Sequence, residues 1–285
     1  MDNKNVFIAV ALSMSVLLFW SAFVDPPKPN ENQNETISSE QIKNKELDDG
    51  LVPNINESKV EQKISRDKSI KKTNRILLEN NKIKGSISLE GAVIDDVSFK
   101  NYQEDLESNK SVVFLNPKET DDGYFIESGW ASIGNKIKVP DNKSNWSVKG
   151  NNNLTNNSPI ILEWNNGSGL LFRKKITLDD SYLFKVTQEV ENKSPQRVEL
   201  YPYAQVTRNK KPEDLQDFFI LHEGFVGVLD EELKEDGYKD VEEKKITREA
   251  NKGWVGITDK YWMTALVPEN GENFKSTFLY QDAYK

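Results

Sequence analysis

The uncharged run Val6–Val24 restricts the architecture of this chain more than any other feature. As a helix rising about 1.5 Å per residue it would be about 28 Å long, close to the hydrocarbon thickness of a bilayer. A single segment crosses a bilayer only as a helix, because each backbone N–H and C=O must be paired within it. Phe19 and Trp20 stand near its end, where aromatic side chains suit the membrane interface. The run predicts a transmembrane anchor at residues 6–24.

A cleaved secretory signal and a buried core helix are the alternatives for this run. Signal cleavage needs small residues at the −3 and −1 positions, and the run is longer than a usual signal core. The possible pairs near its end each include a bulky aromatic residue: Ser21 with Phe23, Trp20 with Ala22, or Phe19 with Ser21. A core helix would need a polar face, which this run lacks. The uncleaved anchor is therefore favoured.

The charges on both sides of the anchor give its orientation. The short N-tail at residues 1–5 carries Lys4 and the amino terminus against Asp2, whereas the other flank opens with Asp25. The positive-inside tendency places the N-tail in the cytoplasm and residues 25–285 on the other side of the membrane.

Residues 25–73 are rich in Asn, Glu, Lys, Gln and Ser, and their isolated apolar residues keep no period. Such a segment buries too little apolar area to offset the entropy lost on ordering. We expect a disordered polar linker at residues 25–73.

Composition excludes several classes of function. The 285 residues carry a net charge of −8, which disfavours nucleic acid as a partner. The chain has no Cys and a single His, His222, so thiolate metal sites, disulfides and catalytic His pairs within the chain are excluded. We expect no enzyme: the sequence predicts no catalytic, cofactor-binding or metal-binding residues and no cofactor.

From residue 74 onward the apolar residues follow a period of two, which predicts β-strands. Turn residues separate these runs at intervals of roughly ten residues, a spacing typical of an antiparallel sandwich. The predicted strands are Arg75–Glu79, Lys82–Glu90, Ala92–Phe99, Val112–Leu115, Tyr124–Trp130, Trp146–Val148, Ile160–Trp164, Leu170–Leu178, Tyr182–Glu191, Val198–Arg208, Phe225–Leu229, Trp254–Thr258, Met263–Val267 and Phe274–Tyr280. One short helix is predicted at Pro212–His222, and Asn80-Asn81 is predicted as a turn that tolerates positive φ.

Motifs that could carry chemistry have simpler structural interpretations. Asp121-Asp122-Gly123 and Asp179-Asp180-Ser181 lack the ligand spacing of a calcium loop and are interpreted as hairpin turns, as is Gly167-Ser168-Gly169. We interpret His222 as a structural or surface histidine, and the charged runs Asp230–Glu235 and Val241–Lys245 as solvated edges.

Five tryptophans of the body bear on a possible sugar site. Trp130, Trp146, Trp164, Trp254 and Trp262 are expected mostly in the core, although a sugar-binding groove is the alternative.

The stretch Gly253–Pro268, GWVGITDKYWMTALVP, resembles a segment of the periplasmic domain of the bacterial membrane protein insertases of the YidC/Oxa/Alb family. Asn74–Tyr102, with ISLEGAVIDDVSF inside it, resembles the opening strands of that domain. Leu170–Lys193 resembles its central hairpin, and Phe225–Glu243 the stretch that leads into GWVG. The order and spacing match over nearly the whole chain, and the anchor is similar to the family's first transmembrane helix.

The resemblance implies a mainly β body at residues 74–285, an antiparallel β-supersandwich similar to the galactose-mutarotase fold. It implies that the chain takes part in inserting membrane proteins into the bacterial inner membrane. The implied partners are nascent membrane proteins, the Sec translocon with its accessory subunits, and the lipid bilayer. The family continues into further transmembrane helices that carry the insertase groove, and nothing in this chain corresponds to them. We therefore expect an incomplete β domain without the insertase helices.

The alternative from another class is a membrane-anchored carbohydrate-binding or mutarotase-like protein. A mutarotase mechanism needs a general acid and base, and His222 alone does not supply both.

Overall fold

The computed structural model describes residues 63–132, 136–212, 215, 221–269 and 273–281. The predicted N-tail, the predicted anchor and most of the predicted linker lie outside the described residues. None of the helices in the described ranges has the length and hydropathy needed to span a membrane.

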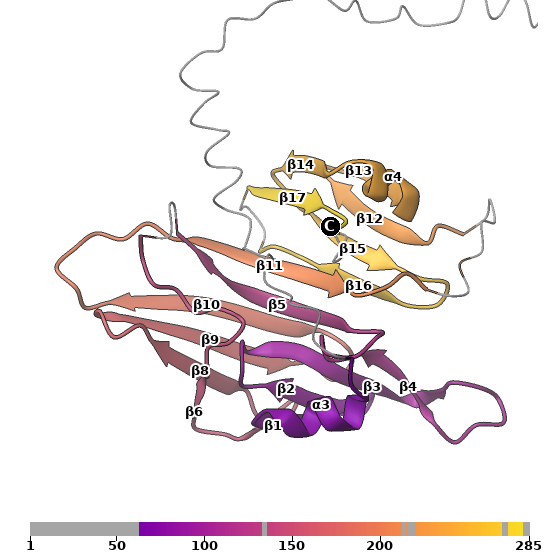
Figure 1. The fold of residues 1–285 in the computed structure, drawn as a ribbon, viewed down its shortest axis with the longest axis horizontal. Helices are drawn as coiled ribbons and strands as arrows, with labels where there is room; N and C mark the ends of the chain where they lie inside the picture. Colours follow the sequence, from indigo (N-terminus) through magenta and orange to yellow (C-terminus); the bar gives the residue numbers. More distant parts are fainter. Residues whose placement is uncertain (1–62, 133–135, 213–214, 216–220, 270–272, 282–285) are drawn as a thin grey trace, which may run out of the picture. The chain divides into compact units, whose positions relative to one another are not determined.

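The described body is built from antiparallel sheets, with one parallel pair, β1 with β7 (Figure 1). The first sheet runs in the order β11-β5-β3-β2-β1-β7, with β4 paired to β3. Its strands are β1 (Arg75–Glu79), β2 (Ile83–Ser88), β3 (Val93–Gln103), β4 (Ser111–Leu115), β5 (Tyr124–Ala131), β7 (Asn153–Leu154) and β11 (Tyr201–Arg208).

Three smaller sheets and two short helices complete the described body. The second sheet runs β10-β9-β8-β6, the third runs β13-β12-β15-β16, and β14 pairs with β17. The strands of the second sheet are β6 (Ser147–Lys149), β8 (Ile160–Asn165), β9 (Leu170–Leu178) and β10 (Phe184–Asn192). The others are β12 (Gly224–Leu229), β13 (Glu232–Gly237), β14 (Ile246–Ala250), β15 (Gly253–Thr258), β16 (Met263–Leu266) and β17 (Phe274–Phe278). The helices are α3 (Arg66–Lys72) and α4 (Tyr238–Glu243).

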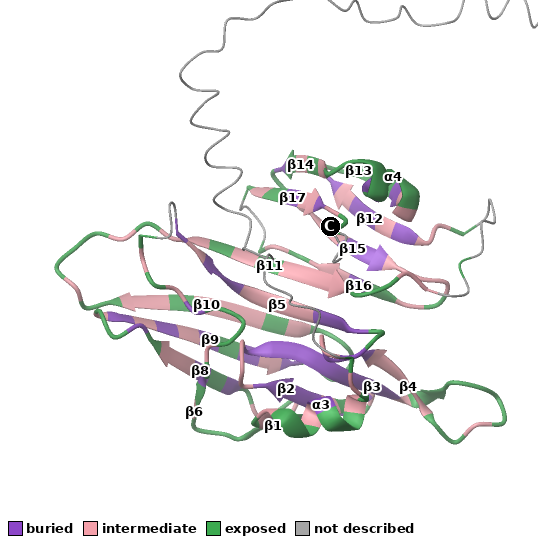
Figure 2. Cartoon of the chain, in the orientation of Figure 1, coloured by how far each residue is buried: buried purple, intermediate pink, exposed green. Residues whose placement is uncertain are grey.

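The main hydrophobic core joins the first and second sheets. Leu170, Phe172, Ile176 and Leu178 alternate along β9 with more exposed residues and are at most 3% exposed. They join a single buried cluster with residues of the first sheet such as Ile87. Figure 2 shows β3 buried over most of its length. The mainly β, antiparallel body predicted from the period of two is confirmed.

Each predicted strand has an observed counterpart with ends shifted by only a few residues. The turn predicted at Asn80-Asn81 is present between β1 and β2, and neither residue adopts the positive φ that the pair tolerates. The Asn80 side chain closes the turn instead: its Oδ1 accepts the N–H groups of Lys82 and Ile83 at 2.8 and 2.9 Å. Its Nδ2 donates to the carbonyls of Asp179 and Ser181, both at 2.8 Å. The side chain thus ties this turn to the β9–β10 turn.

Two charged strands, β13 and β14, do not appear among the sequence-based predictions. The run Asp230–Glu235 was expected as a solvated edge, and β13 does lie at the edge of its sheet. Its last acidic residue is nevertheless buried: Asp236 is 8% exposed and binds Arg248 of β14 through two contacts of 2.5 and 2.8 Å. The second charged run contains α4, whose Val241 is buried.

Two further predictions differ from the structure or fall outside it. The linker was predicted to extend to Thr73, but α3 and its flanks occupy residues 63–73, held by polar contacts that local composition does not reveal. The helix predicted at Pro212–His222 lies largely outside the described residues, and its described members are not helical.

The GWVG segment owes its glycines to close approach between strands. β15 lies between β12 and β16. A Cβ on Gly253 would lie 1.8 Å from the carbonyl oxygen of Val228, and its φ of +131° favours glycine. A Cβ on Gly256 would lie 2.2 Å from the carbonyl oxygen of Thr264. Any other residue at these positions would push the central strand away from its neighbours.

The core of β9 contains one ionisable side chain, Lys174, which is 1% exposed. Its Nζ donates to the carbonyl of Ser128 at 2.5 Å and lies 4.9 Å from the ring centroid of Trp146. Burial lowers the pKa of Lys174 to about 7, although the charge of Glu127 opposes the shift. The protein therefore carries a penalty for holding a charge in its core near neutral pH.

We expect Lys174→Met to raise the free energy of unfolding at pH 7 by about 1–4 kcal/mol. The pKa is lower in the folded chain than in the unfolded chain, so the folded state binds fewer protons between pH 7 and 10.5. Stability should therefore rise with pH across that window in the wild type, and less so in the variant. Urea unfolding from pH 6 to 10 measures both effects. Lys175→Met, at the exposed neighbouring position, is the matched control. A variant no more stable than the wild type, with the same pH slope, would refute the burial penalty.

Candidate functional site

Helix α3 is the first helix or strand of the described residues and precedes β1. Ser65 is its N-cap, and the Ser65 carbonyl accepts the N–H groups of Lys68 and Ser69, both at 3.0 Å. Asp67 in the first turn and Lys71 in the last turn complement the helix dipole. One residue before the cap, the Ile64 N–H donates to the Glu119 carbonyl at 3.1 Å, in the loop between β4 and β5.

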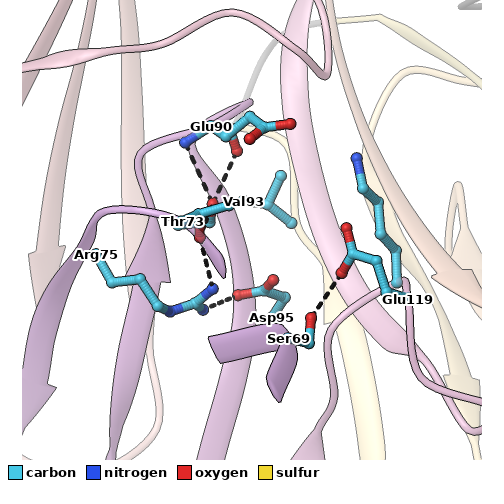
Figure 3. Close-up of a pocket in the computed structure, with 9 residues that line it drawn as sticks. Ser69, Thr73, Arg75, Glu90, Val93, Asp95 and Glu119 are labelled. Carbon is cyan, nitrogen blue, oxygen red and sulfur yellow. Dashed lines mark hydrogen bonds and ion pairs between the residues drawn. The ribbon is translucent and has the colours of Figure 1, made fainter. Parts of the chain in front are cut away.

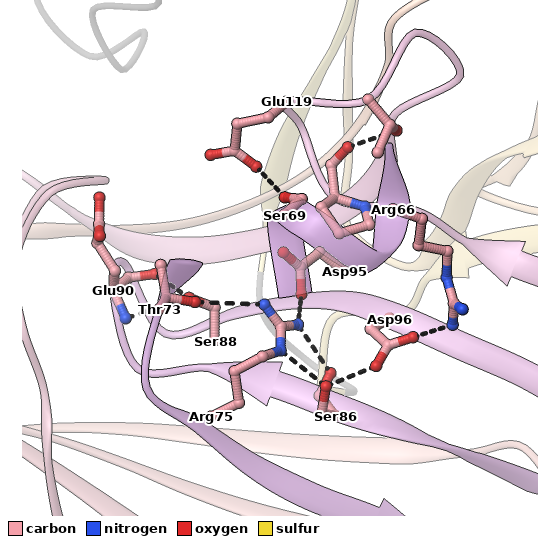
Figure 4. A network of polar contacts seen from close by, with 12 residues as sticks. Arg66, Ser69, Thr73, Arg75, Ser86, Ser88, Glu90, Asp95, Asp96 and Glu119 are labelled. Atoms are coloured by element: carbon pink, nitrogen blue, oxygen red, sulfur yellow. Dashed lines mark hydrogen bonds and ion pairs between the residues drawn. The ribbon is translucent and has the colours of Figure 1, made fainter. Parts of the chain in front are cut away.

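Polar side chains fasten α3 to β3 and to the β4–β5 loop (Figure 4). Arg66 forms an ion pair with Asp96, which is 7% exposed at its side chain, and donates to Ser98 Oγ at 3.3 Å. Ser69 Oγ donates to Glu119 Oε2 at 2.7 Å. Ser69 is the only buried residue of α3. The helix is therefore held by charge and hydrogen bonds and adds little to the hydrophobic core.

A second ion pair adjoins the first and is more deeply buried. Arg75 on β1 pairs with Asp95, and both side chains are 7% exposed. The Arg75 Nε donates to Ser86 Oγ at 2.7 Å, and Ser86 Oγ donates to Asp96 Oδ2 at 2.5 Å. Ser86 thus connects the two ion pairs. We call Arg66, Ser69, Arg75, Ser86, Asp95, Asp96 and Glu119 the α3 clamp.

An irregularity in the pairing of β2 with β3 explains how two consecutive carboxylates, Asp95 and Asp96, both belong to the clamp. β2 and β3 pair Ser86 with Asp96 and Ile87 with Ile94, so Asp95 has no partner across the ladder. A bulge of this kind re-aims a side chain. It lets Asp95 and Asp96 both point into the clamp, where a regular strand would send one of them to the opposite face.

Burial sets the electrostatics of the clamp. It raises the pKa of Asp95 to about 6, against the lowering effect of Arg75, and the nearby charges of Asp96 and Glu119 act in the same direction as burial. The Asp95 carboxylate therefore begins to take up a proton only slightly below neutral pH.

Four residues of the clamp, Ser69, Arg75, Asp95 and Glu119, help to line a small polar pocket (Figure 3). Its walls include Ser69, Thr73, Arg75, Ser88, Glu90, Val93, Asp95, Lys118 and Glu119. It has room for roughly one water molecule, far below the several hundred Å³ of a typical ligand site. The geometry suits holding the chain in place, and no substrate of ordinary size fits there.

The turn motifs are placed as predicted. Asp179 Oδ1 accepts the N–H groups of Ser181 and Leu183 at 2.8 and 2.9 Å, between β9 and β10. Asp122 accepts from Asn116 Nδ2 at 3.0 Å, between β4 and β5. Gly167 and its neighbours form the β8–β9 turn.

The sole histidine has a structural contact, with its Nε2 2.8 Å from the carbonyl oxygen of Phe225. No three His, Asp or Glu side chains in the described ranges lie close enough to hold a metal ion.

The tryptophans divide between core and partial exposure. Trp130 and Trp146 are 5% and 4% exposed, and their ring centroids lie 6.4 Å apart. The expectation of core positions is confirmed for these two, which leaves neither available to a sugar. Trp164, Trp254 and Trp262 are partly buried.

Sequence reasoning missed the clamp. The only available signal was Asp95-Asp96 inside the apolar strand VIDDV, since consecutive buried carboxylates need nearby cations. Nothing in the local sequence shows that Arg66 and Arg75 supply them.

We expect Arg66→Ala to loosen α3 without unfolding the body. Arg66 is partly exposed, and the buried Asp96 keeps its hydrogen bond from Ser86 Oγ, so the loss of the pair should lower global stability by about 1–3 kcal/mol. Amide hydrogen exchange at residues 66–72 should accelerate at least tenfold while β9 stays protected. Lys68→Ala removes an exposed charge from the same helix and is the control. Equal protection of α3 in both variants would show that the ion pair does not hold the helix.

We expect Asp95 to contribute to the pH dependence of the free energy of unfolding. Its pKa is higher in the folded chain than the usual 3.8, so the folded state binds more protons between pH 4 and 6. The contribution of Asp95 to stability should fall by up to about 3 kcal/mol as pH rises through that window. Asp95→Asn carries a neutral side chain of the same shape, so it should lose this slope and should be at least as stable as the wild type at pH 7. Chemical unfolding at several pH values tests this, and parallel pH profiles would rule out the shift.

The family profile of the YidC periplasmic domain matches residues 75–285. The chain is 42% identical over 285 residues to the membrane protein insertase YidC of Pelagibacter ubique (strain HTCC1062), covering 100% of this chain and 50% of that protein. It is 37% identical over 297 residues to the YidC insertase of Jannaschia sp. (strain CCS1), covering 98% and 47%. The corresponding values for Rhizobium meliloti (strain 1021) are 34% over 312 residues, 100% and 51%.

The chain thus spans about half the length of these curated relatives. The matched region coincides with the mainly β body that begins at β1. The chain belongs to the YidC family, and its residues 75–285 belong to that family's periplasmic domain.

Proposed function

We propose that this chain is the anchor and periplasmic domain of a membrane protein insertase of the bacterial inner membrane. The carrying observation is the match over residues 75–285, together with 42% identity that extends over the whole chain to a protein named as an insertase. In this proposal residues 1–5 are cytoplasmic, residues 6–24 cross the membrane, a polar linker follows, and the body lies in the periplasm. The proposal also includes the specific fold of the body, a β-supersandwich similar to the galactose-mutarotase fold.

Insertion is a transfer between solvents and needs no covalent chemistry. A polar or charged group pays a large desolvation cost when it enters hydrocarbon, and an insertase lowers that cost by offering a polar path. No cofactor and no catalytic residue is needed for such a step. The proposed partners are nascent membrane proteins, the bilayer, and the Sec translocon with its accessory subunits.

The α3 clamp supports a positioning role for the body. The clamp holds α3 against β3, and the Ile64 N–H donates to the Glu119 carbonyl. The carbohydrate-binding alternative gains no support from the buried Trp130 and Trp146.

Topology is directly testable because the chain has no native cysteine. Single cysteines placed at Asn3 and Asn151 in the full protein should react differently with a membrane-impermeant maleimide applied to spheroplasts. Asn151→Cys, in an exposed loop of the body, should be labelled, and Asn3→Cys should be labelled only after the membrane is permeabilised. Labelling of both in intact spheroplasts would contradict the proposed orientation.

Activity is tested by complementation. The natural gene that encodes this chain should restore membrane insertion of a reporter in bacteria depleted of their own insertase. Asn151→Cys should restore it equally and is the control for expression. Failure of a well-expressed, correctly oriented protein to restore insertion would refute the proposed function while leaving family membership intact.

A further inference from the structure

Aromatic side chains from distant parts of the sequence meet around Phe99 near the end of β3. The Phe99 ring centroid lies 4.4 Å from that of Trp262, 5.0 Å from that of Phe114 and 5.7 Å from that of Tyr182. Tyr102 also contacts the Trp262 ring, with centroids 4.8 Å apart. We call these five residues the aromatic patch.

The patch has a buried base and an exposed rim. Phe99 is 5% exposed, whereas Tyr102 and Tyr182 are 46% and 45% exposed. Large apolar side chains of the adjoining segments are more exposed still: Leu183 at 62%, Tyr261 at 71% and Leu106 at 100%. Contiguous exposed aromatic surface of this kind marks interaction sites.

The turns that carry the patch are fixed by hydrogen bonds. The turn before Tyr182 is closed by the Asp179 carboxylate and held by the Asn80 side chain. The turn before Trp262 is held by Arg208, which donates to both carboxylate oxygens of Asp259 at 2.6 and 2.7 Å. The Asp259 N–H also donates to the Trp262 carbonyl at 2.8 Å. A rigid aromatic surface loses little entropy on binding, which is the property of an interface hot spot.

The loop beside Tyr102 carries a net negative charge. This loop joins β3 to β4 and projects beyond the sheet (Figure 1). It carries Glu104, Asp105 and Glu107, and within the described part of the chain none of these carboxylates is paired with a cation. The loop also contains Lys110, and the nearby Lys100 is occupied by Glu79 at 2.5 Å.

We propose that the aromatic patch and the β3–β4 loop form a docking surface for an extended protein segment that carries both apolar and basic side chains. Apolar side chains of the segment contact the aromatic rim, and its Lys or Arg side chains face the three carboxylates and the ring faces. The proposal concerns the body alone and holds whether or not the chain takes part in insertion.

A membrane surface is the main competing occupant, since Trp and Tyr also suit the lipid interface. The carboxylates of the β3–β4 loop disfavour it. Bacterial-type anionic lipids attract basic segments and repel acidic ones. The charge of the loop therefore selects a basic protein segment over a lipid headgroup layer.

The test uses the full chain in nanodiscs of zwitterionic lipid and two fluorescent peptides of identical Leu and Trp content. One peptide carries Lys and the other carries Glu at the same positions. Fluorescence anisotropy should show the Lys peptide binding at least tenfold more tightly than the Glu peptide, with an affinity that falls as salt rises. Hydrogen exchange should slow at residues 179–183 and 259–263 when the Lys peptide binds.

Two sets of variants separate the contributions. Tyr102→Ser with Tyr182→Ser should weaken binding of the Lys peptide about tenfold or more. Glu104→Gln with Asp105→Asn and Glu107→Gln should weaken binding of the Lys peptide severalfold and flatten its salt dependence. This second set keeps the docking proposal testable if the tyrosine variant unfolds. Leu233→Ser, on an exposed strand of the third sheet, is the control and should bind like the wild type.

Several results would overturn the proposal. They are equal binding of the Lys and Glu peptides, binding that neither set of variants weakens, and no binding at millimolar peptide. Protection of the same residues by anionic nanodiscs without peptide would assign the surface to the membrane.

Discussion

Burial of alternate side chains between the first and second sheets is the constraint on which the rest of the body depends. β9 turns Leu170, Phe172 and Ile176 inward, and its neighbours β8 and β10 must keep the same register to cover them. A slip of one residue would turn this whole set outward, so the register is specified strongly. The burial of Lys174 in this face shows how strong the constraint is. The chain tolerates a lysine whose pKa is driven to about 7 without giving up the pairing of β9.

The same constraint explains what the sequence allowed us to predict. Strands such as β8, β9 and β10 can be predicted from the sequence, because burial of one face imposes a period of two on their apolar residues. Strands β13 and β14 have no such pattern, since their stability comes from pairing and from the contact of Asp236 with Arg248. Such a contact links residues that lie on different strands of different sheets. No local window of sequence contains it, and the charged composition alone points to solvent.

The α3 clamp and the aromatic patch could not be predicted from the sequence for a similar reason. The α3 clamp joins Arg66 to Asp96, and the aromatic patch joins Phe99 to Tyr182 and Trp262. Each residue taken singly has an ordinary explanation as a surface charge or a core aromatic. Only the folded chain brings them together. The glycines of the GWVG segment are an intermediate case. The motif is recognisable in the sequence, but the sequence does not show its cause, which is the close approach of neighbouring backbones at Gly253 and Gly256.

The contrast between clamp and core has a mechanical consequence. The core is apolar and joins two sheets, so its opening costs most of the free energy of unfolding. Helix α3 contributes one buried residue and is attached by only a few polar contacts. The helix should therefore open far more often than the sheets beneath it. A segment with that behaviour yields first when the N-terminal part of the chain is pulled. The sheets then stay folded while α3 detaches from β3 and from the β4–β5 loop.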